Sequence, residues 1–397
     1  STSSFFYPSV GLSGVISEMI QMPSFIDYMK VRGSFSSVGM PYPRNLTSPT
    51  YEYNEATQSW KPKTHYPIGD LKPERTDSWE VGLDMKLFKD FNLGLSWYLA
   101  NTFNQTFDPQ ISVSSGYTTI YLQTGYVRNT GLELSLGYGH TWNNNFRWDS
   151  NFTLSHNKNK IKELVRDYVH PETGELINKD RLDVGGLGKA RFILKEGGTL
   201  GDLYTQSDLK RDDNGMVDID PTGIVAIENN LPDIKLGSVF PKANLAWSNH
   251  FSWKGISLSA LFTARIGGIV YSATEAAMDQ YGVSERSALA RDNGGVLVNN
   301  RTLVDAQNYY TTIGSESGLP QYYTYNATNV RLQEASIGYL IPRKWLGNVC
   351  DIQVSVIGRN LWMIYNKAPF DPESVATTDN YYQGIDYFMM PSTRNIG

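Results

Sequence analysis

The fold class follows from residues 81–99, which read VGLDMKLFKDFNLGLSWYL. Apolar residues occupy the odd positions on both sides of Lys89-Asp90, and Gly, Ser, Asn, Asp and Lys occupy most of the even positions. This period-two alternation is typical of a β-strand with one apolar and one polar face. Because only Lys89 and Asp90 separate the two runs, the stretch predicts a tight β-hairpin.

The same alternation predicts four further hairpins, at 7–37, 132–154, 245–262 and 330–356. The earliest pairs a strand at 7–20 with one at 25–37. In the last, the apolar parity slips between Leu332 and Ile337, which predicts a β-bulge at Glu334-Ala335. Residues 390–397 resemble the beginning of another strand, so the chain is expected to contain about ten or eleven strands.

Composition favours a membrane barrel over a soluble domain. The 397 residues are 40% hydrophobic and only 19% charged, with 25 Tyr, 16 Phe and 9 Trp, and the mean hydropathy is −0.36. Strands that face lipid on one side and water on the other give this profile. A net charge of −5 without a basic stripe argues against a nucleic-acid partner, and the single Cys350 excludes an internal disulfide framework.

The connections between the predicted strands are very unequal in length. Turns within hairpins are short, whereas the segments between hairpins are expected to be long extracellular loops, at about 38–76, 106–126, 161–240, 271–328 and 366–390. Outer-membrane barrels alternate short periplasmic turns with long extracellular loops in this way. Four tryptophans near the tight turns fit an interfacial aromatic belt: Trp142, Trp148, Trp253 and Trp345. We therefore predict an all-β fold, a transmembrane antiparallel β-barrel without a transmembrane helix.

Short motifs, in order along the chain, resemble the SusC/RagA family of TonB-dependent outer-membrane transporters of Bacteroidetes. Residues 71–84 (LKPERTDSWEVGLD) are similar to the family's approach to a barrel strand, and 127–134 (VRNTGLEL) to its N-x-G-x-E strand start. Residues 358–362 (GRNLW) resemble a motif near the end of the family's barrel. The segments 371–373, 384–386 and 391–394 resemble its closing loop and last strand.

This resemblance implies that residues 1–397 are roughly the C-terminal half of a 22-stranded barrel, without the plug domain. It also implies import of a glycan or peptide nutrient across the bacterial outer membrane. The implied partners are a SusD-like surface lipoprotein, which would act as a lid, and TonB with ExbB and ExbD, which would act through the plug. The strands themselves would contact outer-membrane lipid.

The sequence gives little support for a metal site, a phosphate-binding loop or an enzyme. The five histidines, at 65, 140, 156, 170 and 250, lack metal-ligand spacing. Residues 185–190 (GGLGKA) resemble a phosphate-binding loop only superficially, because Ala190 stands where Ser or Thr is needed, so a flexible loop is expected. No motif predicts a cofactor or an enzyme. An acidic turn at 210–220 leaves an irregular Ca²⁺ site as a weak alternative, with Asp212, Asn214, Asp218 and Asp220 as its ligands.

Aromatic residues in the long loops are the candidate contacts for a ligand or partner protein. Exposed rings offer apolar faces to sugars and hydroxyls to polar groups, although packing within the loops would explain them equally. The candidates are Trp60, Tyr309, Tyr310, Tyr322, Tyr323, Tyr325, Tyr381 and Tyr382. Two alternative functions remain open: a passive porin or smaller complete barrel, and a soluble β-sandwich that binds glycans.

Overall fold

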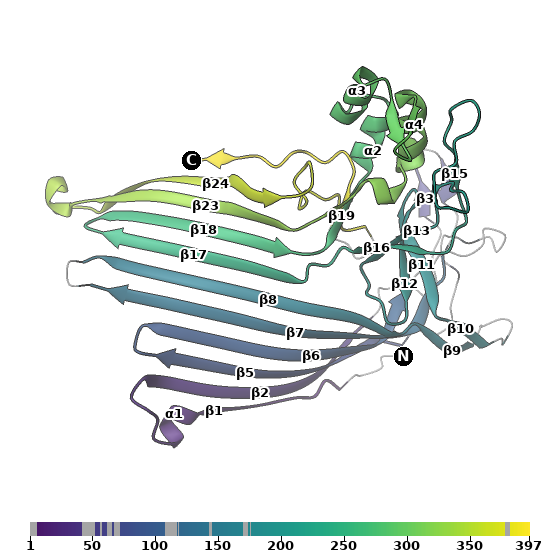
Figure 1. Ribbon diagram of the computed structural model, residues 1–397. Coiled ribbons are helices and arrows are strands. Elements are labelled where there is room, and N and C mark those ends of the chain that lie inside the picture. Colours follow the sequence, from purple (N-terminus) through teal and green to yellow (C-terminus); the bar gives the residue numbers. More distant parts are fainter. Residues whose placement is uncertain are drawn as a thin grey trace.

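Eleven strands form one antiparallel sheet, which we call the wall (Figure 1). The computed structural model describes residues 6–41, 52–55, 58–61, 66, 72–107, 117, 119–142, 145–169, 174, 176–377 and 382–397. Each wall strand pairs with the next wall strand along the chain. In spatial order they are β1 (Ser9–Val15), β2 (Ile26–Met40), β5 (Glu74–Leu87), β6 (Phe91–Phe107), β7 (Leu122–Thr141), β8 (Arg147–Glu163), β17 (Ala243–Trp253), β18 (Ile256–Ile266), β23 (Asn329–Ile341), β24 (Ile352–Asn366) and β26 (Asn395–Ile396).

The predicted hairpins are all present. In the first, Val81 pairs with Trp97 and Leu87 with Phe91, so the turn contains the three residues 88–90 and not the predicted two. The hairpin β17–β18 closes with Trp253 opposite Ile256. Its two turn residues, Lys254 and Gly255, both have positive φ, 47° and 88°, the conformation that matches the twist of a two-residue hairpin. Among the described helices, none is long and apolar enough to cross a bilayer.

Two other local predictions were also wrong in detail. The bulge in β23 lies at Gln333, since Leu332 and Glu334 pair with the consecutive residues Phe262 and Leu261 of β18. The predicted strand at 7–20 ends at Val15, and a short helix, α1 (Ile16–Met19), replaces its end.

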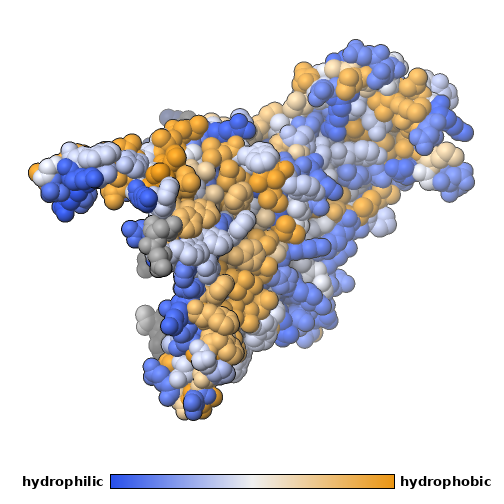
Figure 2. All heavy atoms as spheres, turned by 60° about the vertical axis from the view of Figure 1, so that its left-hand side comes forward, coloured by the Kyte–Doolittle hydropathy of each residue, from blue (hydrophilic) through white to orange (hydrophobic). Residues whose placement is uncertain are grey.

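The wall has an apolar outward face and a polar inward face. On the outward face, Leu134 pairs with Leu154 and Leu136 with Phe152, whereas the next residue, Ser135, points inward. Figure 2 shows hydrophobic side chains gathered over the strands. These side chains remain exposed in the chain by itself; Leu136, for example, is 43% exposed. A bilayer supplies the environment that covers such a face.

Aromatic rings form a nearly continuous row across the tight-turn end of this face. Phe91 lies 4.7 Å from Tyr138 between ring centroids, Tyr138 lies 5.1 Å from Trp148, and Trp148 lies 5.8 Å from Phe251. The row extends to Phe88, whose ring is 6.5 Å from that of Phe91. Aromatic residues concentrate at the membrane–water interface, so this row marks the membrane boundary on the side of the tight turns.

At the other end, the long connections fold into a body with its own core (Figure 1). A four-stranded sheet is built from β11 (Arg181–Leu187), β12 (Ala190–Lys195), β13 (Asp202–Thr205) and β16 (Ile234–Ser238). The body also contains three helices: α2 (Ala273–Gln280), α3 (Glu285–Asp292) and α4 (Ala306–Gly314). The wall contributes only Phe107, Leu122, Val127 and Ile161 to the buried cluster among the described residues, all near the loop end of their strands.

Short elements complete the long connections. The remaining strands are β3 (Glu52–Asn54), β4 (Ser59–Lys61), β9 (Val165–Val169), β10 (Leu176–Lys179), β14 (Asp208–Leu209), β15 (Ile227–Glu228), β19 (Ile269–Ser272), β20 (Val296–Val298), β21 (Thr302–Val304), β22 (Thr324–Asn326) and β25 (Ile385–Asp386). The 3₁₀ turns are η2 (Ser315–Ser317), η3 (Pro320–Tyr322) and η4 (Arg343–Leu346). Strand β19 pairs with β22 and β25, which joins two long connections in one small sheet.

The two faces of the wall predict opposite responses to a charge. We expect Leu134→Lys to destabilise the barrel by about 2–4 kcal/mol, because it places a lysine near the middle of the lipid-facing band. Ser135→Lys, one residue along the same strand but on the inward face, should change stability far less. Reversible denaturant unfolding of the full-length protein in lipid vesicles measures both. Equal destabilisation by the two substitutions would contradict the assignment of faces.

Candidate functional site: the polar wall and the closing connection

The inward face of the wall is a polar surface with three adjoining depressions. The largest, about 610 Å³, lies toward the tight turns and is lined by Lys86, Asp90, Arg147, Asp149 and His250, among others. Two others, about 420 and 410 Å³, are shallow and lie along β5 to β8 and β17. Amide, hydroxyl and charged groups alternate along this surface, so it can exchange hydrogen bonds with a polar solute or with a polar protein surface.

An ionic clasp, made by Arg32, Glu80, Asp84 and Ser96, connects three wall strands on this face. Arg32 of β2 pairs with Glu80 of β5, donates to Ser96 Oγ of β6 at 2.6 Å, and has Asp84 at 3.9 Å. Gly82 lies directly beneath the arginine, because a Cβ there would be 2.5 Å from Arg32 Nε. The motif Glu80-Val81-Gly82-Leu83-Asp84 therefore has a physical role: its carboxylates hold the arginine and its glycine makes room for it.

The second motif on the polar wall follows the same logic. The Tyr98 ring of β6 lies over Gly131 of β7, where a Cβ would be 2.3 Å from the ring. The Tyr98 hydroxyl donates to Asn157 Oδ1 at 3.3 Å, and Asn157 in turn donates to Asn129 Oδ1 at 3.2 Å. Within residues 129–133, Gly131 therefore makes room for the Tyr98 ring, and the side-chain amide of Asn129 links β7 to β8.

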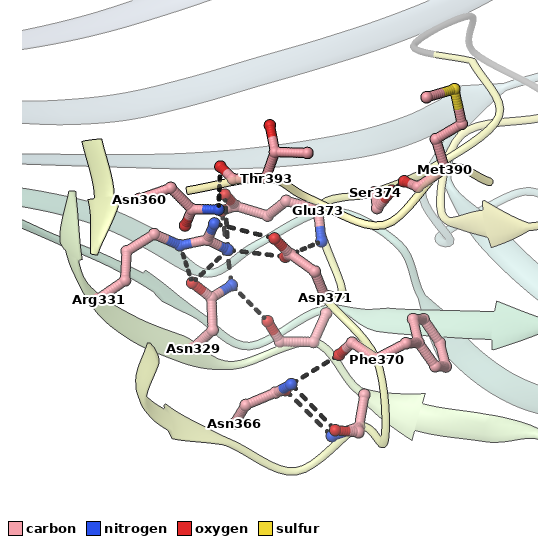
Figure 3. A network of polar contacts seen from close by, with 12 residues as sticks. Asn329, Arg331, Asn360, Asn366, Phe370, Asp371, Glu373, Ser374, Met390 and Thr393 are labelled. Atoms are coloured by element: carbon pink, nitrogen blue, oxygen red, sulfur yellow. Dashed lines mark hydrogen bonds and ion pairs between the residues drawn. The ribbon is translucent and has the colours of Figure 1, made fainter. Parts of the chain in front are cut away.

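The closing connection, residues 367–394 between β24 and β26, is anchored by a buried arginine (Figure 3). Arg331 of β23 is 4% exposed and donates to both carboxylate oxygens of Asp371, at 3.1 and 2.8 Å. It also pairs with Glu373 at 3.0 Å and donates to Asn329 Oδ1. Two parallel hydrogen bonds fix both the position and the orientation of the carboxylate.

Further contacts hold the rest of the closing connection. Asn366 donates to the carbonyl oxygens of Ala368 and Phe370, at 2.9 and 2.6 Å. Asn360 of β24 donates to the Thr393 carbonyl at 3.3 Å, next to the start of β26 (Figure 3). Ile385 and Asp386 pair in parallel with β19, and Ser272 Oγ donates to Asp386. The described residues of this connection are therefore fixed at several points to β19, β23 and β24.

The pKa of Asp371 reflects this environment. Burial acts to raise the pKa of the carboxyl, but the hydrogen bonds from Arg331 and the Glu373 backbone N–H outweigh it, so the pKa lies below its ordinary value. A lowered folded-state pKa stabilises the fold at a pH above the unfolded value of about 3.9. That stabilisation is lost as the pH falls through the folded-state value.

Tyr323 is a packing residue of the body in this structure. It is fully buried, its hydroxyl donates to Asp279 Oδ2 at 2.9 Å, and the Arg286 guanidinium lies 4.9 Å from its ring centroid. Asp279 also accepts hydrogen bonds from Ser284 and from Arg286. Burial, together with the nearby Asp279 charge, raises the pKa of Tyr323 well above its ordinary value.

The other aromatic candidates divide into packed and exposed residues. Tyr309, Tyr310 and Tyr322 pack against the core of the body, and burial raises the pKa of Tyr322 to about 12. Tyr325 packs edge-on against Phe370, with ring centroids 5.8 Å apart.

Two candidates are exposed: Trp60 is 63% exposed and packs edge-on against Tyr53, and Tyr382 is 44% exposed. Tyr381 lies outside the described residues, as do His65 and His170.

The acidic segment at 210–220 forms two consecutive turns. The Asp212 carboxylate accepts the N–H groups of Asn214 and Met216, and that of Asp220 accepts those of Thr222 and Ile224. Asp218 pairs with Lys210 at 2.8 Å. The described residues contain no group of three His, Cys, Asp or Glu placed to hold a metal ion. Capping of turns accounts for these carboxylates.

The expectation of a flexible loop at 185–190 was wrong. Residues 181–187 and 190–195 form the hairpin β11–β12, and Lys189 in its turn pairs with Glu316 at 2.8 Å. Gly186 is required there, because a Cβ would meet the Ala190 carbonyl oxygen at 2.1 Å. The glycines serve a close approach between two strands of the body.

Comparison with known proteins identifies the family. The family model described as "TonB dependent receptor-like, beta-barrel" matches residues 1–361. The chain belongs to this family. It is therefore an outer-membrane β-barrel, and its family comprises receptors and transporters. The resemblance to SusC/RagA proteins is confirmed.

Relatives and solved structures place the chain within longer proteins. TonB-dependent receptor P3 of Formosa agariphila is 25% identical over 365 residues, which are 84% of this chain and 34% of that protein. TonB-dependent receptor P39 of the same organism is 28% identical over 211 residues, 51% of this chain and 18% of that protein. The structure of the RagAB peptide transporter shares the fold, with a TM-score of 0.70 at 19% identity, covering 98% of this chain and 42% of that chain. The chain thus spans about a third or less of the curated relatives.

Removing the buried arginine should release the closing connection. We expect Arg331→Met to destabilise the protein by about 3–5 kcal/mol, because it leaves the Asp371 carboxylate buried without its partner. Arg359→Met is the matched control: Arg359 pairs with Glu334 at 2.9 Å, but its side chain is 66% exposed, so its loss should change stability by about 1 kcal/mol or less. Denaturant unfolding and the rate of proteolysis within 367–394 measure the difference. Similar effects of the two substitutions would contradict the anchoring role of Arg331.

Proposed function

We propose that this chain is part of an importer that moves an oligomeric polar nutrient, a glycan or a peptide, across the outer membrane with energy from TonB. Membership of the TonB-dependent receptor family carries the proposal. The polar inward wall supports it, because a water-lined passage needs hydrogen-bonding groups along its surface. A passive porin and a soluble glycan-binding sandwich receive no comparable support.

We further propose that a SusD-like surface lipoprotein covers the body of long connections. The body has a packed core and carries exposed apolar side chains, among them Tyr281 at 77% and Val283 at 69%. A rigid surface with exposed aromatic and aliphatic residues suits a protein partner. TonB, with ExbB and ExbD, would act through a plug domain that residues 1–397 do not include.

Loss of TonB should abolish uptake by the full-length protein. In cells that express it with its lipoprotein partner, we expect accumulation of labelled oligosaccharide or peptide to fall to the level of cells without the transporter when the cognate TonB is deleted. Comparing a glycan and a peptide pool in the same assay identifies the ligand class. Uptake that persists without TonB would favour a passive porin.

The two exposed aromatic candidates are proposed as ligand contacts. We expect Trp60→Ala and Tyr382→Ala each to raise the half-saturating substrate concentration about two- to tenfold, since one aromatic contact contributes about 0.5–1.5 kcal/mol. Trp345→Ala is the control, because Trp345 is 66% exposed but lies in η4 at the tight-turn end, away from the body. An unchanged half-saturating concentration in both test variants would remove these residues from the site.

A further inference from the structure

A column of lysines occupies the outward face of β8 at its loop end. Residues 156–162 read HNKNKIK, and the parity of the strand places Lys158 and Lys160 on the same side as Phe152 and Leu154. Lys162 follows at a bulge, since Ile161 pairs with Val127 and Glu163 pairs with Tyr126. The alternate residues point inward: Ile161 is fully buried in the core of the body, and Asn159 accepts the Leu200 N–H. The three lysines are exposed.

A fourth cation joins this column from the next strand. Arg128 of β7 lies directly opposite Lys160 in the register, a like-charge pair that is unfavourable in an antiparallel sheet. Arg128 donates to Asn101 Oδ1 at 2.8 Å and to the Tyr126 hydroxyl at 2.6 Å, both uncharged. Repulsion from Arg128, Lys158 and Lys160 acts on Lys162.

One carboxylate lies at this end of the strand: Glu163, which follows Lys162 and pairs in register with Tyr126. None of the ion pairs formed by the described residues includes Lys158, Lys160, Lys162 or Arg128. The carboxylate in the same register row, Asp77 of β5, lies two strands from Arg128 and is held by Arg75 at 2.9 Å and by Ser37 at 2.6 Å. The four cations therefore outnumber the neighbouring Glu163 carboxylate and form a basic column, which an anion would stabilise.

The height of the column above the tight-turn aromatic row matches the thickness of the membrane. Lys158 is ten residues along β8 from Trp148, or about 33 Å at 3.3 Å per residue, which gives about 25 Å of height at a tilt of 40°. The apolar band of an outer-membrane barrel is about 25 Å tall. Beside the column, the rings of Phe103 and Tyr126 stack at 4.8 Å, as interfacial aromatic residues would.

We propose that the basic column, Arg128, Lys158, Lys160 and Lys162, binds the phosphate groups of a lipid headgroup in the outer leaflet. A lipid suits this site better than a protein does, because the column lies on the same strand and the same face as the lipid-facing apolar side chains, nearer the loop end. Apolar side chains below the column contact the acyl chains, and the cations above meet the phosphates at the interface. The inference rests on the outer-membrane location and is independent of import.

Native mass spectrometry of the full-length protein in detergent tests this binding. The probe is phosphorylated lipid A, compared with the same lipid after removal of its phosphates and with phosphatidylcholine. For the triple variant Lys158→Gln/Lys160→Gln/Lys162→Gln we expect affinity for the phosphorylated lipid to fall about tenfold or more, because each cation near an anionic headgroup adds to binding. Affinity for the two other lipids should not change.

Two control variants keep the outcome interpretable. Lys86→Gln/Lys89→Gln/Lys254→Gln removes the same charge from exposed lysines at the tight-turn end and should bind the phosphorylated lipid as the unaltered protein does. The triple Lys→Arg variant of the column should also retain binding, which separates loss of charge from misfolding. Unchanged binding in the Gln variant would overturn the proposal. So would displacement of the lipid by equimolar inorganic phosphate, which would indicate a site for free anions.

Discussion

Pairing of every backbone polar group within the bilayer is the constraint on which this structure depends. Lipid hydrocarbon offers no partner to an N–H or C=O group, so a chain can cross as strands only if each strand pairs with its neighbours. The wall strands from β2 to β24 each have a neighbour on both sides. Their side chains consequently divide between lipid and lumen, and this leaves the wall almost no core of its own. The buried core lies instead in the body built by the long connections.

The inward face of the wall is held together by polar contacts that need space. Arg32 crosses above Gly82 to reach Glu80, and Tyr98 lies over Gly131. A larger residue at either glycine would displace the side chain that covers it. A buried ion pair also holds the closing connection, because Arg331 of β23 pairs with Asp371 at the loop end of the wall. These contacts give a physical role to the alternating Glu80, Gly82 and Asp84 of this chain.

The wall could be predicted from the sequence, and the body could not. Alternation fixes which residues share a face, and Lys254-Gly255 fixes where a hairpin turns, so register follows there from local information. At Lys89-Asp90 the turn also includes Phe88, which shifts the pairing by one residue. The Gly185–Ala190 segment has no such pattern, and its turn contacts Glu316, which lies more than a hundred residues away in the sequence. Its residue type and its place in a long loop make Tyr323 a candidate for ligand binding. In the structure it is buried against Asp279 and Arg286, and the sequence pattern does not predict these contacts. The bulge at Gln333 was shifted by one residue because parity does not identify which residue is unpaired.

The most direct measurement is the environment of alternate residues along β7. Single cysteines at each position from 132 to 137, in full-length protein whose Cys350 has been replaced, can be labelled with a fluorophore in lipid vesicles. Quenching by a lipid-attached quencher and by a water-soluble quencher is then compared at each site. The structure predicts opposite patterns with a period of two residues: lipid quenching at 132, 134 and 136, and aqueous quenching at 133, 135 and 137. Uniform quenching along the strand would contradict a wall with one face in lipid and the other in a water-lined lumen.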